Sequence, residues 1–231
     1  MKFLILSLLS LNLFAFNLTP LSQSITLGKN SNTVIYQVLN KNKEPIAIEA
    51  SLKIRKMGRD GKEELPDVEE GLFLIYPTQI ILKPGEKRGI KIQYLGNNNL
   101  KNELSYRLLV EQLPVDFKKK TKTGVKLLLR YLGALYVTKD EFKPVLQVKS
   151  MKMVGTDLVI EIANTGSLHQ VLKNLELTFF DTSVKKIVLT KDRLPSFNGE
   201  NILAQSTRVF TISNLTEFKI NQKSKVELSY D

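Results

Sequence analysis

Apolar residues recur at every second position through most of this chain. The clearest stretch is 46–54, where Ile46, Ile48, Ala50, Leu52 and Ile54 share one parity. Side chains alternate between the two faces of a β-strand, so this spacing puts all five on one face of a strand. The same spacing returns at 34–38, 90–94, 106–110 and 125–131. We therefore expect the chain to bury its apolar residues by packing β-sheets, and no long helical pattern competes with that expectation.

Turn-forming residues separate these stretches, at 40–45, 58–61, 84–85 and 96–99. Short alternating strands at such intervals predict an antiparallel sandwich or barrel. The alternation stops over 138–144, a short charged segment that ends at Pro144, and restarts at Val145. A segment of this kind is typical of a linker between domains. We predict an all-β fold of two immunoglobulin-like sandwiches, with domains at 17–142 and 143–231.

The N-terminus has the features of a signal peptide. Lys2 supplies a positive charge, and a mostly apolar stretch from Phe3 to Phe16 follows it. That stretch is too short to span a bilayer as a stable helix. We predict a signal peptide over 1–16, with cleavage near Ala15, and a periplasmic location. A buried N-terminal strand is the alternative, and no later segment is long and apolar enough to insert stably into a membrane.

Composition excludes several kinds of chemistry. The 231 residues include no cysteine, no tryptophan and a single histidine, His169. A disulfide framework, a thiolate site and a histidine-rich metal site are therefore excluded. No catalytic or phosphate-binding motif occurs, so we expect no enzyme activity, no metal and no cofactor. His169 is expected to be structural and bonded to backbone, and the paired acids at 63–64 and 69–70 are expected to be solvated loop residues.

The chain is basic, with a formal net charge of +11. Such a charge suggests an acidic partner, anionic lipid or nucleic acid, and secretion argues against nucleic acid. The densest basic run is 118–122, which a solvated loop would also explain.

Four longer stretches carry a resemblance to a known family. They are 76–92 (strand, Pro-Gly turn, strand), 106–114, 127–137 and 158–169. In this order and spacing they resemble the periplasmic pilus-assembly chaperones, nearest to the archaic or alternative branch. The resemblance implies two immunoglobulin-like domains arranged like a boomerang. It also implies pilin subunits and an outer-membrane usher as partners. Pilins of this kind lack one strand, and the last strand of the chaperone's first domain fills the gap while basic cleft residues hold the pilin's terminal carboxylate. When free, such a chaperone could hide its donor strand by self-association.

The resemblance also implies site residues. It places the donor strand at Val125, Leu127, Leu128, Leu129 and Tyr131. Val125, Leu127 and Leu129 form the row expected to enter the pilin, and Leu128 lies on the opposite face with Leu132. A chaperone needs this strand free and apolar. An adhesion module of immunoglobulin-like domains without strand donation, which is the alternative function, would blunt the edge with charge, proline or a bulge.

The carboxylate anchor departs from the family pattern. The positions that carry basic anchor residues in well-studied members fall near Gln23 and Gly133, and neither residue is basic. Arg107 and Arg130 are the candidates instead, because both stand in apolar strands, where a charge is costly without a partner. Arginine also suits a bidentate carboxylate contact. The alternative is that each arginine pairs with a neighbour such as Glu111 or faces water.

Overall fold

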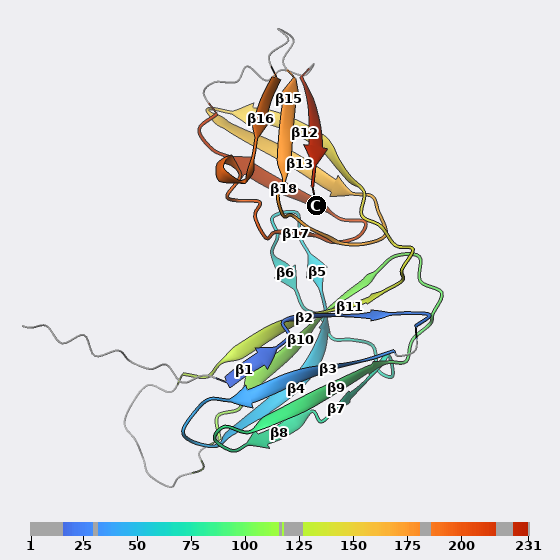
Figure 1. Cartoon of the computed structure of the whole chain (residues 1–231), viewed down its shortest axis with the longest axis vertical. Helices are drawn as coiled ribbons and strands as arrows, with labels where there is room; N and C mark the ends of the chain where they lie inside the picture. The colour runs from blue at the N-terminus through green and yellow to red at the C-terminus, as the bar shows by residue number, and fades with distance from the viewer. Residues whose placement is uncertain are drawn as a thin grey trace, which may run out of the picture.

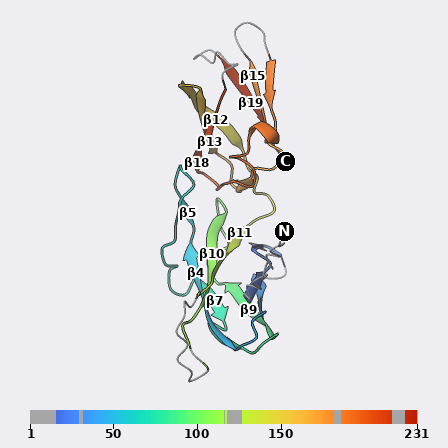
Figure 2. The ribbon, with the colours of Figure 1, turned by 90° about the vertical axis from the view of Figure 1, so that its left-hand side faces the viewer.

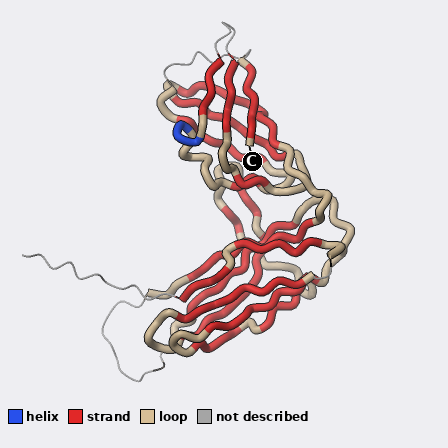
Figure 3. Tube along the Cα trace, in the orientation of Figure 1, coloured by secondary structure: helices blue, strands red, loops and turns tan. Residues whose placement is uncertain are grey.

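The protein is almost entirely β-structure. The computed structural model describes residues 16–29, 32–115, 117, 127–180, 186–215 and 224–230. These residues form β-strands and one short 3-10 helix, η1 (Lys191–Arg193), as Figure 3 shows. No helix among them has the length and apolar content needed to cross a bilayer. The predicted all-β class, with two immunoglobulin-like domains, is confirmed.

Two sheets face each other in the first domain. One has the order β1 (Phe16–Thr19), β3 (Thr33–Asn40), β9 (Lys87–Tyr94), β7 (Phe73–Tyr76). The other has the order β2 (Ser22–Thr26), β11 (Arg130–Thr138), β10 (Leu104–Gln112), β4 (Ile46–Ile54), β8 (Gln79–Leu82). All neighbours are antiparallel except β2 and β11, which run parallel. The alternating stretch at 46–54 thus becomes β4 over the predicted residues.

The core of the first domain lies between these sheets. Tyr36, Ile48, Ile92, Leu108 and Leu135 are among its fully buried side chains. Tyr36 ties the layers together, because its hydroxyl donates a 2.5 Å hydrogen bond to the carbonyl of Ala134 in the opposite sheet. The burial therefore follows the period of two that the sequence shows.

The second domain repeats this plan with shorter sheets. Its sheets have the orders β12 (Leu146–Val154), β13 (Asp157–Asn164), β18 (Thr207–Ile212) and β16 (Lys186–Leu189), β15 (Glu176–Phe180), β19 (Lys225–Ser229). A small pair, β14 (Gln170–Val171) and β17 (Asn201–Ile202), lies at the end nearer the first domain (Figure 1). The core includes Leu158, Ile160, Leu177 and Phe197 and shares no residue with that of the first domain.

The two domains meet at an angle in the view of Figure 1, and in Figure 2 they lie one above the other. The connection runs between Thr138, the end of β11, and Leu146, the start of β12. This break falls within the stretch where the alternation stops, and the exact boundary between 142 and 143 stays a prediction.

A hairpin of the first domain reaches across to the second domain. It consists of β5 (Lys56–Met57) and β6 (Glu63–Glu64), and Figure 1 shows it projecting toward β17. At its tip the Arg59 carbonyl accepts a 2.8 Å hydrogen bond from the Val209 amide, and the Arg59 side chain pairs with Glu161 at 2.8 Å. The hairpin is therefore fixed to both domains.

Most of the predicted signal peptide, 1–15, lies outside the described residues. Its last residue, Phe16, opens β1, is fully buried and packs edge-on against Tyr131, with ring centroids 4.8 Å apart. Phe16 is therefore part of the core of the first domain, and the cleavage site stays a prediction. The leader itself stays a prediction.

Asn164 holds together the start of the second domain. Its side-chain oxygen accepts hydrogen bonds from the amides of Val145 and Gly166, and its nitrogen donates to the carbonyls of Leu168 and Ile202, all within 3.2 Å. The residue is 1% exposed. Asn164→Ala should therefore lower the free energy of unfolding of this domain by about 3 kcal/mol. For a domain of this size that is a fall of about 15 °C in Tm.

Differential scanning calorimetry measures this shift. The matched control is Asn97→Ala, which removes one exposed side-chain hydrogen bond, to the Asn99 amide, and should change Tm by only a few degrees. Equal shifts for the two variants would contradict the structural role of Asn164.

Candidate functional site

One strand edge of the first domain is left open. β11 pairs with β10 along Arg130–Val137, but β2 covers its other side only from Ala134 to Thr138. Among the described residues, no strand pairs with the outer side of β11 from Arg130 to Gly133. We call this segment the open β11 edge. Unpaired edges of this kind accept an added strand from another chain.

Two exposed leucines stand beside this edge on one face. Leu132 is 40% exposed and Leu128, just before the strand, is 41% exposed. Leu129 and Tyr131 have the opposite parity and pack against the core of their own domain. Within β11 itself, the face of Leu132 is therefore the exposed one. The row of Val125, Leu127 and Leu129 that the sequence analysis chose stays a prediction.

Part of the predicted donor strand is not in a β-strand, and part of it lies outside the described residues. β11 begins only at Arg130, so Leu127, Leu128 and Leu129 precede it, and the Leu129 carbonyl still accepts a 2.9 Å hydrogen bond from the Gln112 amide of β10. Leu127 is exposed, at 64%. Val125 and the basic run 118–122 lie outside the described residues, so the structure says nothing of them.

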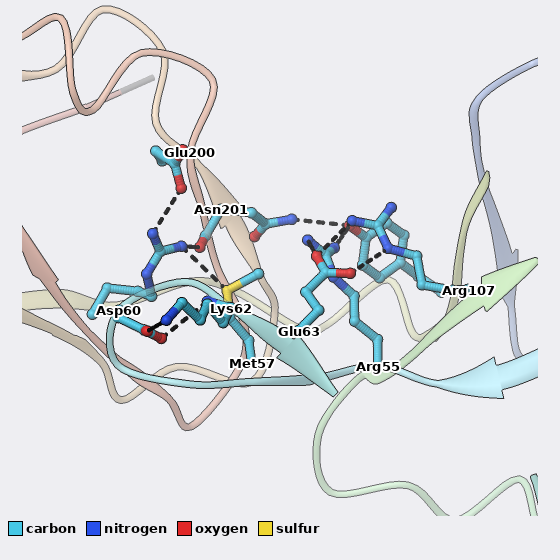
Figure 4. Close-up of polar contacts among 10 residues, drawn as sticks. Arg55, Met57, Asp60, Lys62, Glu63, Arg107, Glu200 and Asn201 are labelled. Carbon is cyan, nitrogen blue, oxygen red and sulfur yellow. Dashed lines mark hydrogen bonds and ion pairs between the residues drawn. The ribbon is translucent and has the colours of Figure 1, made fainter. Parts of the chain in front are cut away.

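A compact ion cluster includes Arg107, which pairs with Ala134, the residue that follows the open β11 edge. Figure 4 shows Arg55 and Arg107 converging on Glu63. Arg107 donates from Nε and from one terminal nitrogen to the two Glu63 oxygens, at 2.8 and 2.6 Å. Arg55 donates to Glu63 Oε1 from Nε at 2.7 Å and to the Tyr136 hydroxyl at 2.9 Å. We call Arg55, Glu63, Arg107 and Tyr136 the Glu63 cluster.

The Glu63 cluster keeps one positive charge in excess, because two arginines share one carboxylate. Burial raises the pKa of Glu63, but hydrogen bonds from Arg107 and the charges of both arginines outweigh that effect and hold the pKa below its usual value. Glu63 is therefore ionised at neutral pH. Sequence reasoning missed it, because a pair of acids in a polar segment has no apolar period to mark it as buried.

The two predicted anchor arginines do not meet. Arg107 lies opposite Ala134 in the ladder and Arg130 lies opposite Glu111, four residues apart along the strands, or about 13 Å. Arg130 is largely exposed, and its Nε donates to Glu111 Oε1 at 2.6 Å. This is the neighbour pairing that the sequence analysis kept as the alternative. One carboxylate cannot contact both arginines in this arrangement.

The two family anchor positions are occupied differently. The side chain of Gln23 donates a hydrogen bond to the Ile35 carbonyl at 2.7 Å. Gly133 faces the core, where an added Cβ would lie 3.2 Å from the Tyr36 ring and 3.3 Å from Leu18. A lysine at 133 would therefore point into the core and not toward a partner, so its absence here has a structural reason.

The single histidine lies where the domains meet. The His169 ring stacks on Tyr136 at a centroid distance of 3.9 Å, and its Nδ1 lies 2.6 Å from Glu103 Oε1. Tyr136 in turn accepts a hydrogen bond from Asn201 of the second domain. The residue is structural in placement, although its ring partner is a carboxylate and not the backbone.

These parts restrict what can bind. An added strand along the open β11 edge must stop where β2 begins, because the Leu21 carbonyl already accepts the Ala134 amide at 2.7 Å. Arg107 is paired with Ala134 across the ladder and shares the face of Leu132. The end of an added strand would therefore lie beside Ala134, across the ladder from Arg107. If that end is a carboxyl end drawn to Arg107, the added strand would run parallel to β11.

This fold and site define a two-domain immunoglobulin-like protein that offers an unpaired strand edge beside a positive interdomain cluster. Residues 18–136, just over half of the chain, match the family model described as pili and flagellar-assembly chaperone, PapD N-terminal domain. The chain belongs to this family of pili and flagellar-assembly chaperones. The predicted family is thereby confirmed, and the archaic or alternative branch stays a prediction.

Solved structures of the same fold are similar over nearly the whole chain. The chaperone CfaA of class 5 fimbriae has 18% identity and a TM-score of 0.60, covering 94% of this chain and 100% of that one. The CsuC–CsuE chaperone–tip adhesion subunit complex from archaic Csu pili of Acinetobacter baumannii has 20% identity and a TM-score of 0.62, covering 93% of this chain and 97% of that one. The Salmonella enterica SafA pilin–SafB chaperone complex has 14% identity and a TM-score of 0.57, covering 88% of this chain and 86% of that one. A search of curated protein sequences gave no match.

Proposed function

We propose that this protein is a periplasmic chaperone of pilus assembly that binds pilin subunits through the open β11 edge and delivers them to an outer-membrane usher. The observation that carries the proposal is the strand edge that ends at β2 beside the Glu63 cluster. A pilin strand paired there satisfies its backbone groups, and Leu128 and Leu132 cover apolar surface that the incomplete subunit exposes. The chaperone acts by binding alone, without catalysis.

Arg107 is the proposed anchor for the terminal carboxylate of the pilin. Its Nε and one N–H of a terminal nitrogen are used by Glu63, and the guanidinium keeps further N–H groups. The side chain is 18% exposed, so a partner can reach it. Arg130 is not part of this anchor, because it lies at the far end of the strand pairing.

Family membership and the open β11 edge favour the chaperone over an adhesion module without strand donation. In such a module we expect the edge to carry charge, proline or a bulge. Here the edge carries one charge, that of Arg130, which is paired with Glu111, and two exposed leucines border the edge.

Purification from the periplasm tests the proposal. We expect the chain to copurify in equal amount with a pilin subunit, identified by mass spectrometry, whose sandwich lacks one strand. The pilin should accumulate when coexpressed with the chaperone and be degraded without it. A pilin that folds and accumulates equally well without this protein would refute the function.

A further inference from the structure

We propose that Glu63 is a positioning residue, which holds Arg107 in place for the terminal carboxylate of the client and ties that anchor to the second domain. This inference rests on the proposed function, because it concerns the same carboxylate. The alternative is that Glu63 competes with the client for Arg107. Three features of the structure separate the two roles.

The first feature is the repulsion that Glu63 removes. Arg55 directly follows β4 and Arg107 lies in β10, the strand beside it, so the two arginines are diagonal neighbours on one face of the sheet. The Arg55 side chain is 5% exposed and cannot turn to water. Without Glu63 between them, Arg107 would be driven away from Arg55. Glu63 is therefore needed to keep Arg107 on the sheet.

The second feature is that Glu63 contacts only one side of the Arg107 guanidinium. Glu63 accepts hydrogen bonds from Nε and one terminal nitrogen, which fixes the plane of the group. The other terminal nitrogen has no hydrogen bond to any described residue. A carboxylate can bind on that side without displacing Glu63, so the two carboxylates do not compete for the same N–H groups.

The third feature is that Glu63 cannot readily leave. It is paired with Met57 in the β5–β6 hairpin, whose tip is bonded to Val209 and Glu161 of the second domain. The Arg208 guanidinium also donates to the Met57 sulfur at 3.3 Å and pairs with Glu200 at 2.7 Å. Gly61 leaves room for it, because an added Cβ would lie 2.2 Å from an Arg208 nitrogen. Releasing Glu63 would require this interdomain hairpin to move.

Two synthetic peptides provide the test. Each is a short strand of alternating valine and threonine, one ending in a free carboxylate and the other in an amide. For the wild-type protein we expect the free carboxylate to improve Kd by about tenfold over the amide. In Glu63→Gln this ratio should fall close to one, because Arg107 is no longer fixed. Glu64→Gln, the exposed neighbour in β6, is the matched control and should keep the wild-type ratio.

The sign of the effect separates the two roles. Tighter binding of the free carboxylate by Glu63→Gln would show competition and would overturn the proposal, as would an unchanged ratio. Glu63→Asp, which keeps the charge but shortens the side chain, should also lower the ratio and serves if the glutamine variant does not fold. A wild-type ratio kept by aspartate would mean that charge alone matters, and positioning would be refuted.

A spectroscopic readout separates positioning from general stability. In an NMR spectrum, the Nε–Hε signal of Arg107 should be resolved and slow to exchange with water in the wild-type protein, and averaged in Glu63→Gln.

The peptide ratio also tests the proposed function itself. If the wild-type protein binds the free-carboxylate and amide peptides equally well, the carboxylate anchor of the proposed function is refuted. If only the positioning role of Glu63 is wrong, the wild-type protein still binds the free-carboxylate peptide about tenfold more tightly than the amide peptide. The two failures are therefore distinguishable.

Discussion

Leu132→Asp is expected to abolish pilin capture while leaving the chaperone folded. Leu132 stands on the open β11 edge, and its side chain is partly solvent-exposed, so a charge there is tolerated in the free protein. In the proposed complex with pilin the same side chain would enter an apolar groove. Losing its burial costs about 1.5–3 kcal/mol, and the unpaired charge adds to that cost. The affinity should fall by a factor of about 100 or more.

Copurification of pilin and the Tm of the free protein measure these two effects. Val154→Asp is the matched control, because Val154 is similarly exposed but lies in β12 of the second domain, and it should capture pilin normally. Leu135→Asp provides the opposite control, since Leu135 is fully buried in the core and the variant should unfold. Normal capture by Leu132→Asp would remove β11 from the binding site.

Arg107→Glu is expected to be equally damaging, for an electrostatic reason. The reversal changes the net charge of the Glu63 cluster from +1 to −1, because one arginine would then face two carboxylates. A terminal carboxylate brought to this place would be repelled instead of bound, and capture of pilin should be lost. The new carboxylate also faces Glu63, so we expect a lower Tm as well.

Arg130→Glu is the comparison that makes this test decisive. Arg130 is exposed and pairs with Glu111 at the other end of the ladder, so its reversal should weaken capture only slightly. Binding of the free-carboxylate and amide peptides separates loss of the anchor from loss of stability. If Arg130→Glu loses capture and Arg107→Glu retains it, the anchor lies at the far end of β11 and the assignment given above is refuted.

Much of the fold could be predicted from the sequence, because the period of two is a local property. The row from Ile46 to Ile54 predicted β4 over its observed residues, and the pause before Val145 predicted the connection between the sandwiches. The strand nearest the linker was also predicted to be the donor strand, and that role stays a prediction. Two arginines in apolar strands were noticed for a sound reason, since both are paired with acids.

The details of the site could not be predicted in the same way. Periodicity states that Tyr131 and Leu132 face opposite sides of β11, but it does not state which side is the core. That depends on Tyr36 and Leu18, which arrive from the other sheet and contact the position of Gly133. The role of Glu63 depends on Arg107, which is 44 residues away along the chain, and no local sequence pattern predicts that contact.

The sequence by itself determined that this chain forms β-strands, that they divide into two sandwiches, and that an apolar strand precedes the linker. These follow from side-chain alternation, turn residues and charge, which act between neighbours in the chain. Only the tertiary structure decided that the pairing of β2 with β11 begins at Ala134 and leaves the rest of the edge open, and that Arg107 lies at this end of the ladder and Arg130 at the other. Those properties arise where distant segments meet, and the free energy of such contacts has no signature within any single segment.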